Sequence, residues 1–296
     1  MKKILGLMVA LTCLAIALPA TAQIPGFRRM LPARTIGMAG MGRSFAAGAS
    51  ALYLNPAGLA VVPQYTIGTG YSYLNADPTA HSLNLSWTDS SPNMYHLGMG
   101  IAYNYMFDEK DWDSHNVHFG LTFTLPTNVM NIHFGAAGHR LWNAFQTSED
   151  VWNGDLGIIL DFSRKLMIGV AGYSLVRNQR NLSPRGVGGG ISYWHERFMI
   201  GAEMNAQIDA MDENGQEETR LEYQGGLQFM VIPQFYLRGG VGYESTQGRT
   251  NVGAGVTIIA QEMIGIELGY QQNVTDTSDI IFSAMLEFYN PFGQGH

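Results

Sequence analysis

The chain has 296 residues, a net charge of −7 with histidine counted as neutral, and charged side chains at only 14% of its positions. Soluble domains carry about 25% charged residues and about 7% glycine, whereas 36 residues of this chain are glycine. The acidic balance excludes the basic patch that nucleic-acid binding requires, so we expect no nucleic-acid partner. Cys13 is the only cysteine, which excludes a disulfide framework and a thiolate metal site.

The first residues have the pattern of a secretory signal peptide. Lys2 and Lys3 precede an apolar run over residues 4–18, and an Ala-Thr-Ala cleavage site ends at Ala22. The apolar run is shorter than the ~20 residues that span a bilayer, which disfavours the alternative of a membrane anchor. We therefore predict a signal peptide over residues 1–22 and export of the remaining chain.

The next segment, residues 23–63, has neither the period of a helix nor that of a strand. Its central part reads GMAGMGRSFAAGASALYLNPAGLA, which is small, rich in glycine and nearly uncharged. It ends in a turn, because asparagine favours a turn start, proline fixes φ and glycine accepts a positive φ. The turn residues are Asn55, Pro56, Ala57 and Gly58.

From residue 64 onward, apolar residues alternate with polar or small ones. In the segment FMIGAEMNAQID, which starts at Phe198, one face is apolar and the other carries Gly, Glu, Asn, Gln and Asp. A period of two residues is that of a β-strand. The pattern predicts fourteen strands, over residues 64–75, 80–89, 94–107, 114–126, 128–143, 151–163, 166–178, 183–195, 198–210, 219–232, 233–245, 248–260, 263–274 and 278–290.

These strands predict an all-β fold, a transmembrane antiparallel β-barrel over residues 64–296. Connections after even-numbered strands are very short, and several after odd-numbered strands are longer and charged, such as 108–113, 144–150 and 211–218. Outer-membrane barrels have short periplasmic turns and longer outer loops. A soluble sandwich or propeller is the alternative, but the glycine-rich second face of the strands suits a confined lumen better than free solvent.

The glycine-rich segment resembles the N-terminal signature of the FadL-type outer-membrane transport superfamily, including its PorV-like branch. The matching residues are Gly37, Gly40, Gly42, Phe45, Ala46, Ser50, Ala51, Tyr53, Asn55, Pro56, Ala57 and Gly58. The resemblance implies a fourteen-stranded barrel in the bacterial outer membrane, with residues 23–63 as a hatch that occludes the lumen. A lumen of this width has room for such a plug, which an eight-stranded barrel lacks.

Two functions follow from the resemblance. FadL-type members move hydrophobic molecules such as fatty acids through a lateral opening at a strand kink, which implies a passive transporter of small hydrophobic compounds, in contact with outer-membrane lipids. PorV-like members are tied to protein export and surface attachment, which implies envelope or secretion-system partners. The outer loops are short for a fatty-acid transporter. The chain contains no G-x-S-x-G, H-E-x-x-H or P-loop motif, so we expect no enzyme and no cofactor.

Several polar residues are predicted to face the lumen. Arg43 is the plug residue that we expect to contact them. The turn at Asn55 either gates the lumen or is needed only for the plug to fold. The charged candidates are Glu203, Glu222, Arg238, Glu267 and Glu287, which either hold the hatch or hydrate the lumen. The histidine candidates are His96, His118, His133 and His139, for which lumen lining is favoured over a metal or proton-sensing cluster, so we expect no metal site.

The predicted strand that contains the segment GVGGGISY is the richest in glycine, with Gly188, Gly189 and Gly190 in succession. Glycine inside a strand indicates a bulge or kink, or a close approach of another backbone. A kink here would open the barrel wall laterally. Close packing against the hatch explains the same glycines equally well.

Overall fold

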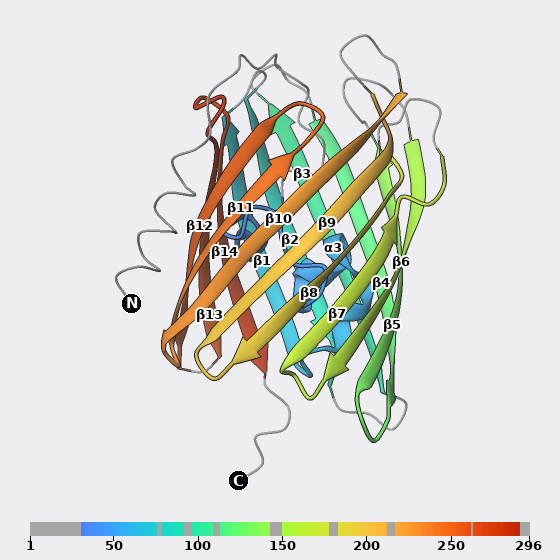
Figure 1. Cartoon of the computed structure of the whole chain (residues 1–296), viewed down its shortest axis with the longest axis vertical. Coiled ribbons are helices and arrows are strands. Elements are labelled where there is room, and N and C mark those ends of the chain that lie inside the picture. Colours follow the sequence, from blue (N-terminus) through green and yellow to red (C-terminus); the bar gives the residue numbers. More distant parts are fainter. Residues whose placement is uncertain are drawn as a thin grey trace.

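A computed structural model of the chain describes residues 31–75, 79–91, 96–108, 113–142, 150–177, 183–211, 217–261 and 263–290. The predicted signal peptide, residues 23–30 and most of the predicted outer loops lie outside the described residues. Fourteen antiparallel strands close into one barrel, in which each strand pairs with its sequence neighbours and β1 pairs with β14 (Figure 1). The predicted barrel is confirmed. No helix among the described residues is long and apolar enough to cross a bilayer.

The strand bounds agree with the predicted pattern to within two residues except in β3, β5, β7 and β8. The strands are β1 (Tyr65–Asn75), β2 (Ala80–Asp89), β3 (Leu97–Asp108), β4 (Asp113–Pro126), β5 (Asn131–Trp142), β6 (Asp150–Phe162), β7 (Leu166–Tyr173), β8 (Gly186–His195), β9 (Phe198–Met211), β10 (Glu217–Ile232), β11 (Phe235–Glu244), β12 (Arg249–Ala260), β13 (Ile264–Asn273) and β14 (Ile280–Asn290). β5 begins three residues later than predicted, because Thr127 and Met130 close a turn with a backbone hydrogen bond of 3.0 Å.

β7 and β8 are shorter than predicted, and the reason lies in Ser174 and Asn153. Ser174 follows β7 with a φ of 51°, which ends the extended conformation. Beyond it, the Asn153 amide bonds the backbone N–H and C=O of Val176 at 2.7 Å each, in place of ladder bonds. β7 and β8 therefore have 8 and 10 residues, whereas the flanking β6 and β9 have 13 and 14, and the regular wall is lower at this point.

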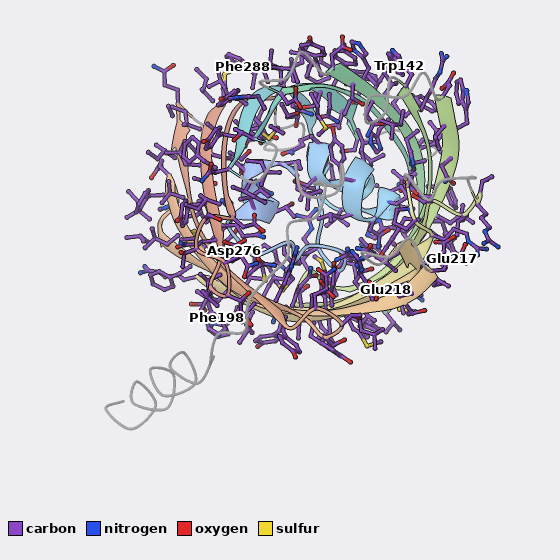
Figure 2. All side chains as sticks on the ribbon, turned by 90° about the horizontal axis from the view of Figure 1, so that it is seen from above. Trp142, Phe198, Glu217, Glu218, Asp276 and Phe288 are labelled. Carbon is purple, nitrogen blue, oxygen red and sulfur yellow. The ribbon has the colours of Figure 1, made fainter. Side chains whose placement is uncertain are left out.

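The outer surface of the barrel is apolar and the inner surface is polar or small. On β9, Ile200 and Met204 are 54% and 52% exposed, while the alternate residue Glu203 is 5% exposed. Phe198 and Phe288 point outward from the wall when the barrel is seen from above (Figure 2). An apolar band around a closed sheet is what a bilayer requires, because every strand then has its backbone paired and its outer face in lipid.

Residues 31–63, which we call the lumenal segment, lie inside the barrel (Figure 2). They form four short helical turns: α2 (Ala33–Ile36), η2 (Gly48–Ser50), α3 (Ala51–Leu54) and η3 (Pro56–Ala60). Their apolar side chains share clusters with the wall, as where Met38, Met41 and Phe45 pack with Met167 and Met199. The core of the protein is therefore the contact between the lumenal segment and the inner wall.

Candidate functional site

A single wall carboxylate, that of Glu203 on β9, holds three consecutive residues of the lumenal segment. It accepts the backbone N–H groups of Gly42 and Ser44, each at 3.0 Å, and the Ser44 hydroxyl at 3.2 Å. The guanidinium of Arg43 lies 3.4 Å from the same carboxylate, and both side chains are almost fully buried. Hydrogen bonds to an ionised acceptor are about twice as strong as neutral ones, so Glu203 acts as a latch on the segment.

The glycines of β8 make room for this latch. A Cβ atom on Gly188 would lie 2.7 Å from Cδ and Nε of Arg43, and one on Gly190 would overlap the Glu203 side chain. β8 pairs with β7 and β9 through Gly188, Gly189 and Gly190 without a register shift, so the structure shows no bulge in this strand. Gly188 packs closely against the lumenal segment, which is the alternative derived from the sequence, while Gly190 packs against the Glu203 side chain of the wall.

Asn55 fixes the second point of the segment. Its side-chain oxygen accepts the N–H of Ala57 at 3.1 Å, which caps η3. Its amide N–H group donates to the Arg43 carbonyl at 2.8 Å and, at 3.4 Å, to the carbonyls of Ile158 and Val170 in the wall. These two wall residues are register partners on β6 and β7. The buried Asn55 side chain thus connects the turn, the Arg43 backbone and the wall.

Three wall glycines form a shelf under this turn and under the adjacent backbone of Arg43 and Ser44, which we call the Asn55 seat. The Asn55 seat consists of Gly135 on β5, Gly157 on β6 and Gly169 on β7. A Cβ atom on Gly135 would overlap the backbone of Pro56 and Ala57, and one on Gly157 would overlap the Asn55 side chain. The turn therefore touches the wall at main-chain distance, which only glycine permits.

A second shelf, the Met38 seat, lies on the strands β11 to β13. It consists of Gly240, Gly253, Gly255 and Gly269. Cβ atoms on these residues would overlap or crowd the backbone of Ala33, Gly37 and Met38. Gly240 pairs with Gly253 and Gly255 with Gly269 across the ladders, so the shelf is continuous. The sequence predicted a glycine-lined lumen but not which glycines receive which part of the segment.

Near the Met38 seat, Arg34 of the lumenal segment binds Glu267 on β13. The guanidinium donates to one carboxylate oxygen at 3.1 Å and 2.7 Å, and its attraction to that carboxylate raises the pKa of Arg34. Arg238 lies 3.7 Å from the same oxygen. Glu287 is also buried on the inner face and accepts the hydroxyl of Tyr289 at 2.6 Å. This region holds three of the predicted charged lumen residues, Arg238, Glu267 and Glu287, while Glu222 binds Asn205 and Gln207.

Three of the four candidate histidines, His118, His133 and His139, are buried on the inner face of the barrel, and the fourth, His96, is not. The Tyr53 ring of the lumenal segment packs on His118, with ring centroids 4.6 Å apart, and His118 stacks on His139 at 5.1 Å. His133 is placed further along β5, where Thr124 is its register partner, so His118 and His133 are not brought together. His96 is exposed and precedes β3 with a φ of 50°, which corrects its predicted inward position.

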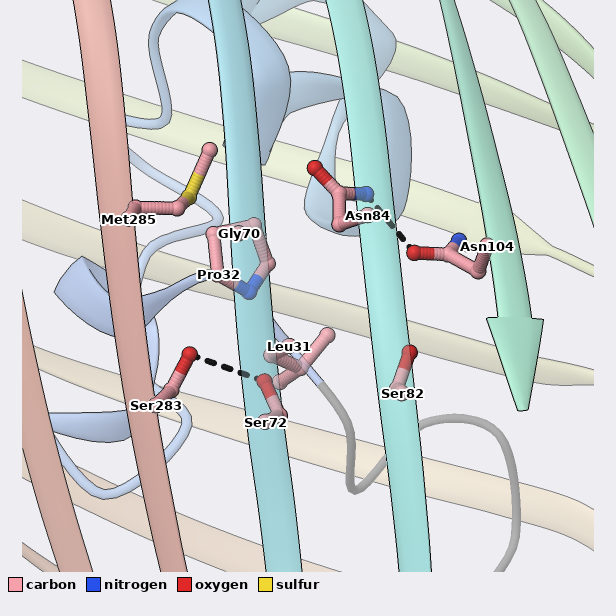
Figure 3. A pocket seen from close by; sticks show the side chains of 9 residues that line it. All are labelled: Leu31, Pro32, Gly70, Ser72, Ser82, Asn84, Asn104, Ser283 and Met285. Carbon is pink, nitrogen blue, oxygen red and sulfur yellow. Dashed lines mark hydrogen bonds between the residues drawn. The ribbon is translucent and has the colours of Figure 1, made fainter. Parts of the chain in front are cut away.

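Two asparagines that the sequence did not single out hold Tyr53. Asn84 and Asn104 donate to its hydroxyl oxygen at 2.9 Å and 2.8 Å, and burial raises the pKa of this phenol. Both asparagines also line a small pocket between the segment and strands β1, β2, β3 and β14 (Figure 3). The pocket volume is about 10 Å³, at the limit of what one water molecule needs, so the segment fills the lumen at this point.

Comparison with solved structures finds barrels of similar fold. No family model matches the sequence, and a search of curated proteins gives no match. The structure is similar to "CymD monoaromatic hydrocarbon channel", with a TM-score of 0.65 and 14% identity over 92% of this chain and 100% of that chain. It is also similar to the Pseudomonas putida toluene transporter TodX, with a TM-score of 0.63 and 11% identity over 93% and 100%.

A Pseudomonas aeruginosa FadL homologue gives a TM-score of 0.64 at 11% identity, over 93% of this chain and 100% of that chain. The fourteen-stranded barrel that the resemblance implies is thereby confirmed at the level of the fold. At these identities the likeness concerns the path of the backbone and not the residues that contact a substrate.

Proposed function

We propose that the protein is a passive channel for small hydrophobic compounds in a bacterial outer membrane, with the lumenal segment as its gate. The observation that supports this most is the polar latch. Glu203 holds an otherwise apolar plug to the wall through a few hydrogen bonds and one ion pair. A plug needed only for stability would be held as well by apolar packing alone, whereas a few polar bonds can be exchanged for water when the plug moves.

The closed conformation implies that transport requires movement of the segment. The pocket of Figure 3 is too small for any organic compound, and the seats hold the segment at main-chain distance. The latch lies beside β8, and the neighbouring β7 is the shortest strand of the barrel. Release of Arg43 from Glu203 would therefore open a path near the shortest strand of the wall.

The side chains between the segment and the wall suit small apolar substrates. Met38 and Met41 face Met167 and Met199 in one buried cluster. Methionine is unbranched and polarizable, so such surfaces adapt to apolar compounds of different shape. The similar structures named as a hydrocarbon channel and a toluene transporter support the same class of substrate, small hydrophobic compounds. Fatty-acid-like compounds are the larger members of this class. We propose neither a catalytic step nor a cofactor.

The test is uptake of a labelled hydrophobic compound by Gram-negative cells whose own fatty-acid channel has been deleted. Cells that make this protein are compared with cells carrying the empty vector, using labelled toluene and a labelled long-chain fatty acid in parallel. The variant Glu203→Gln weakens the latch. Asp209→Asn is the matched control, because Asp209 is a buried carboxylate on the same strand that binds Arg185 instead of the lumenal segment.

We expect faster uptake of at least one compound than in vector cells, a change in rate for Glu203→Gln, and none for Asp209→Asn. The proposal is wrong if folded, surface-assembled protein and its Glu203→Gln variant both give the vector rate for both compounds.

The close fit of the segment favours a second candidate function, a structural or secretion-associated component of the outer membrane. Gly135 and Gly240 bring the segment into main-chain contact with opposite sides of the wall, as a permanent plug would require. In this case the barrel would serve as an anchor for exported proteins. Vector-level uptake together with specific crosslinking of the outer surface to one exported protein would support it.

A further inference from the structure

Three polar side chains that the transport proposal does not use meet on the inner face of β4, β5 and β6. His118 and His139 are direct register partners, and Asp155 is the partner of Ala137, two residues from His139. One nitrogen of each imidazole and one oxygen of the carboxylate all lie within 4.8 Å of one another. We propose that these three residues form a binding site for a divalent transition-metal ion, with Zn²⁺ as the reference ion.

The site is buried and its geometry is largely set in advance. His118, His139 and Asp155 are 6%, 7% and 8% exposed. One Asp155 oxygen accepts the backbone N–H of Ser174 at 2.6 Å, and the other lies 3.3 Å from Nδ1 of His139. That nitrogen makes no hydrogen bond to any residue that the structure describes. A buried imidazole nitrogen directed at a carboxylate without a hydrogen bond is the arrangement that a bound cation would satisfy.

The ligand set matches known zinc chemistry. Two imidazoles and one carboxylate are the protein ligands of open zinc sites, which leave a position for water. Imidazole also suits copper and nickel ions. With zinc–nitrogen bonds of about 2.0–2.1 Å, ligand atoms around zinc lie roughly 3.3 Å apart, so small ring rotations would close the shell from the present separations.

Neighbouring residues support the site from outside. The Asn116 side-chain nitrogen lies 2.9 Å from Nε2 of His118, and its oxygen has no hydrogen-bond partner within the described part of the chain. Turned over by 180°, the amide would place this oxygen to accept Nε2–H of a metal-bound His118, and such partners orient metal-binding imidazoles. The Ser183 hydroxyl lies 3.4 Å from Nε2 of His139. On the lumen side, the Tyr53 ring packs on His118, so a bound ion would fix the wall surface on which the lumenal segment rests.

The test is metal binding to the full protein, folded in detergent and purified through a tag without histidine. After removal of metal with a chelator, Zn²⁺ is titrated by calorimetry and Co²⁺ by visible absorption, which reports nitrogen and oxygen ligands in a low-symmetry shell. The test variants are His139→Gln and Asp155→Asn. The matched control is His133→Gln. His133 is a buried histidine on β5, the strand of His139, and it lies 3.9 Å from the carboxylate of Asp161.

We expect one ion per chain and visible Co²⁺ absorption in the wild type and in His133→Gln. Each test variant should bind at least tenfold more weakly, because loss of a residue that merely orients a ligand already costs about 10- to 100-fold. Heat-dependent gel mobility confirms that each variant is folded. The proposal is overturned if the folded wild type shows no saturable one-to-one binding, or if both test variants bind as the wild type does.

Discussion

The two parts of the lumenal segment are held to the wall in different ways. Residues 33–41 rest on the Met38 seat through their backbone, and their one charged anchor, Arg34, shares Glu267 with Arg238 of the wall. Residues 42–60 also rest on a glycine seat, and their ion pair is with one carboxylate, that of Glu203. Further hydrogen bonds join Arg43, Tyr53 and Asn55 to other wall residues. One wall carboxylate thus binds three consecutive residues of the second part, whereas Glu267 binds the first part only at Arg34.

This difference indicates which part of the gate moves. Loss of one ion pair leaves residues 33–41 in place, because shape and several wall groups still hold them. Loss of the Glu203 contacts removes the charged anchor of residues 42–60, whose Arg43 and Ser44 lie against β7, the shortest strand of the barrel. We therefore expect residues 42–60 to move and residues 33–41 to stay as the fixed end.

The largest effect is expected from Gly135→Ala in the Asn55 seat. The new Cβ would overlap the backbone of Pro56 and Ala57, which cannot rotate away as a side chain can. Overpacking costs about 1–3 kcal/mol, and the backbone overlap places this change at the upper end. Hydrogen exchange followed by mass spectrometry should show residues 51–63 exchanging much faster, since exchange reports local opening.

The control for this change is Gly138→Ala on the same strand, where a Cβ would meet only one carbonyl oxygen at 3.8 Å. Its exchange should match the wild type. Equal exchange of residues 51–63 in both alanine variants would show that the Asn55 seat does not hold the turn.

The next effect is expected from Glu203→Gln, which removes the charge from the latch. Two backbone N–H groups and Arg43 would lose a charged acceptor, at a cost of about 1–3 kcal/mol. That range corresponds to roughly 5- to 150-fold more open segment. Exchange of residues 42–50 should rise by this factor, while exchange of residues 33–41 should change far less. A uniform rise over both parts would contradict the comparison.

A smaller effect is expected from Arg34→Gln. The Arg34 side chain is 29% exposed, and Glu267 keeps its contacts with Arg238 and Thr257. We expect a cost of about 1 kcal/mol or less, because solvent screens a partly exposed ion pair. Exchange of residues 33–41 should rise less than exchange of residues 42–50 does in Glu203→Gln, measured under identical conditions. The reverse order would assign the stronger anchor to Arg34.

The smallest effect is expected from Arg140→Gln on the outer surface. Arg140 and Asp150 form an ion pair whose side chains are 43% and 39% exposed, and neither contacts the lumenal segment. Exposed pairs contribute little to stability. Neither the exchange of residues 31–63 nor the thermal unfolding of the barrel should change measurably, and a change in exchange would mean that the outer wall and the gate are coupled.

The barrel could be predicted from the sequence because alternation is a local property. Residues such as Ile200 and Glu203 reveal their faces within a single strand. The end of β7 could not be predicted from local sequence. Asn153, which lies on β6, bonds the backbone of Val176 in place of strand pairing, and Ser174 has a positive φ that serine does not require.

The candidate site could be predicted only in part. The sequence identified Arg43, Glu203 and the turn at Asn55, since charge and turn residues stand out in an apolar segment. It could not assign the seats, because Gly135 and Gly157 meet the turn only after the barrel has closed around the segment. The contact of His139 with Asp155 also depends on the register of β5 and β6, which the local sequence pattern does not predict.

The central claim, that residues 42–60 leave the wall while residues 33–41 stay, is tested most directly by cysteine labelling. The only native cysteine is Cys13, so Ser44→Cys and Thr35→Cys each give one buried reporter outside the predicted signal peptide. We predict that a maleimide labels Ser44→Cys in the folded protein, and that labelling is roughly 5- to 150-fold faster when Glu203→Gln is added. Thr35→Cys should stay unlabelled both with Glu203 present and with Glu203→Gln. Equal labelling of the two reporters, or none at Ser44→Cys in either background, would contradict the account.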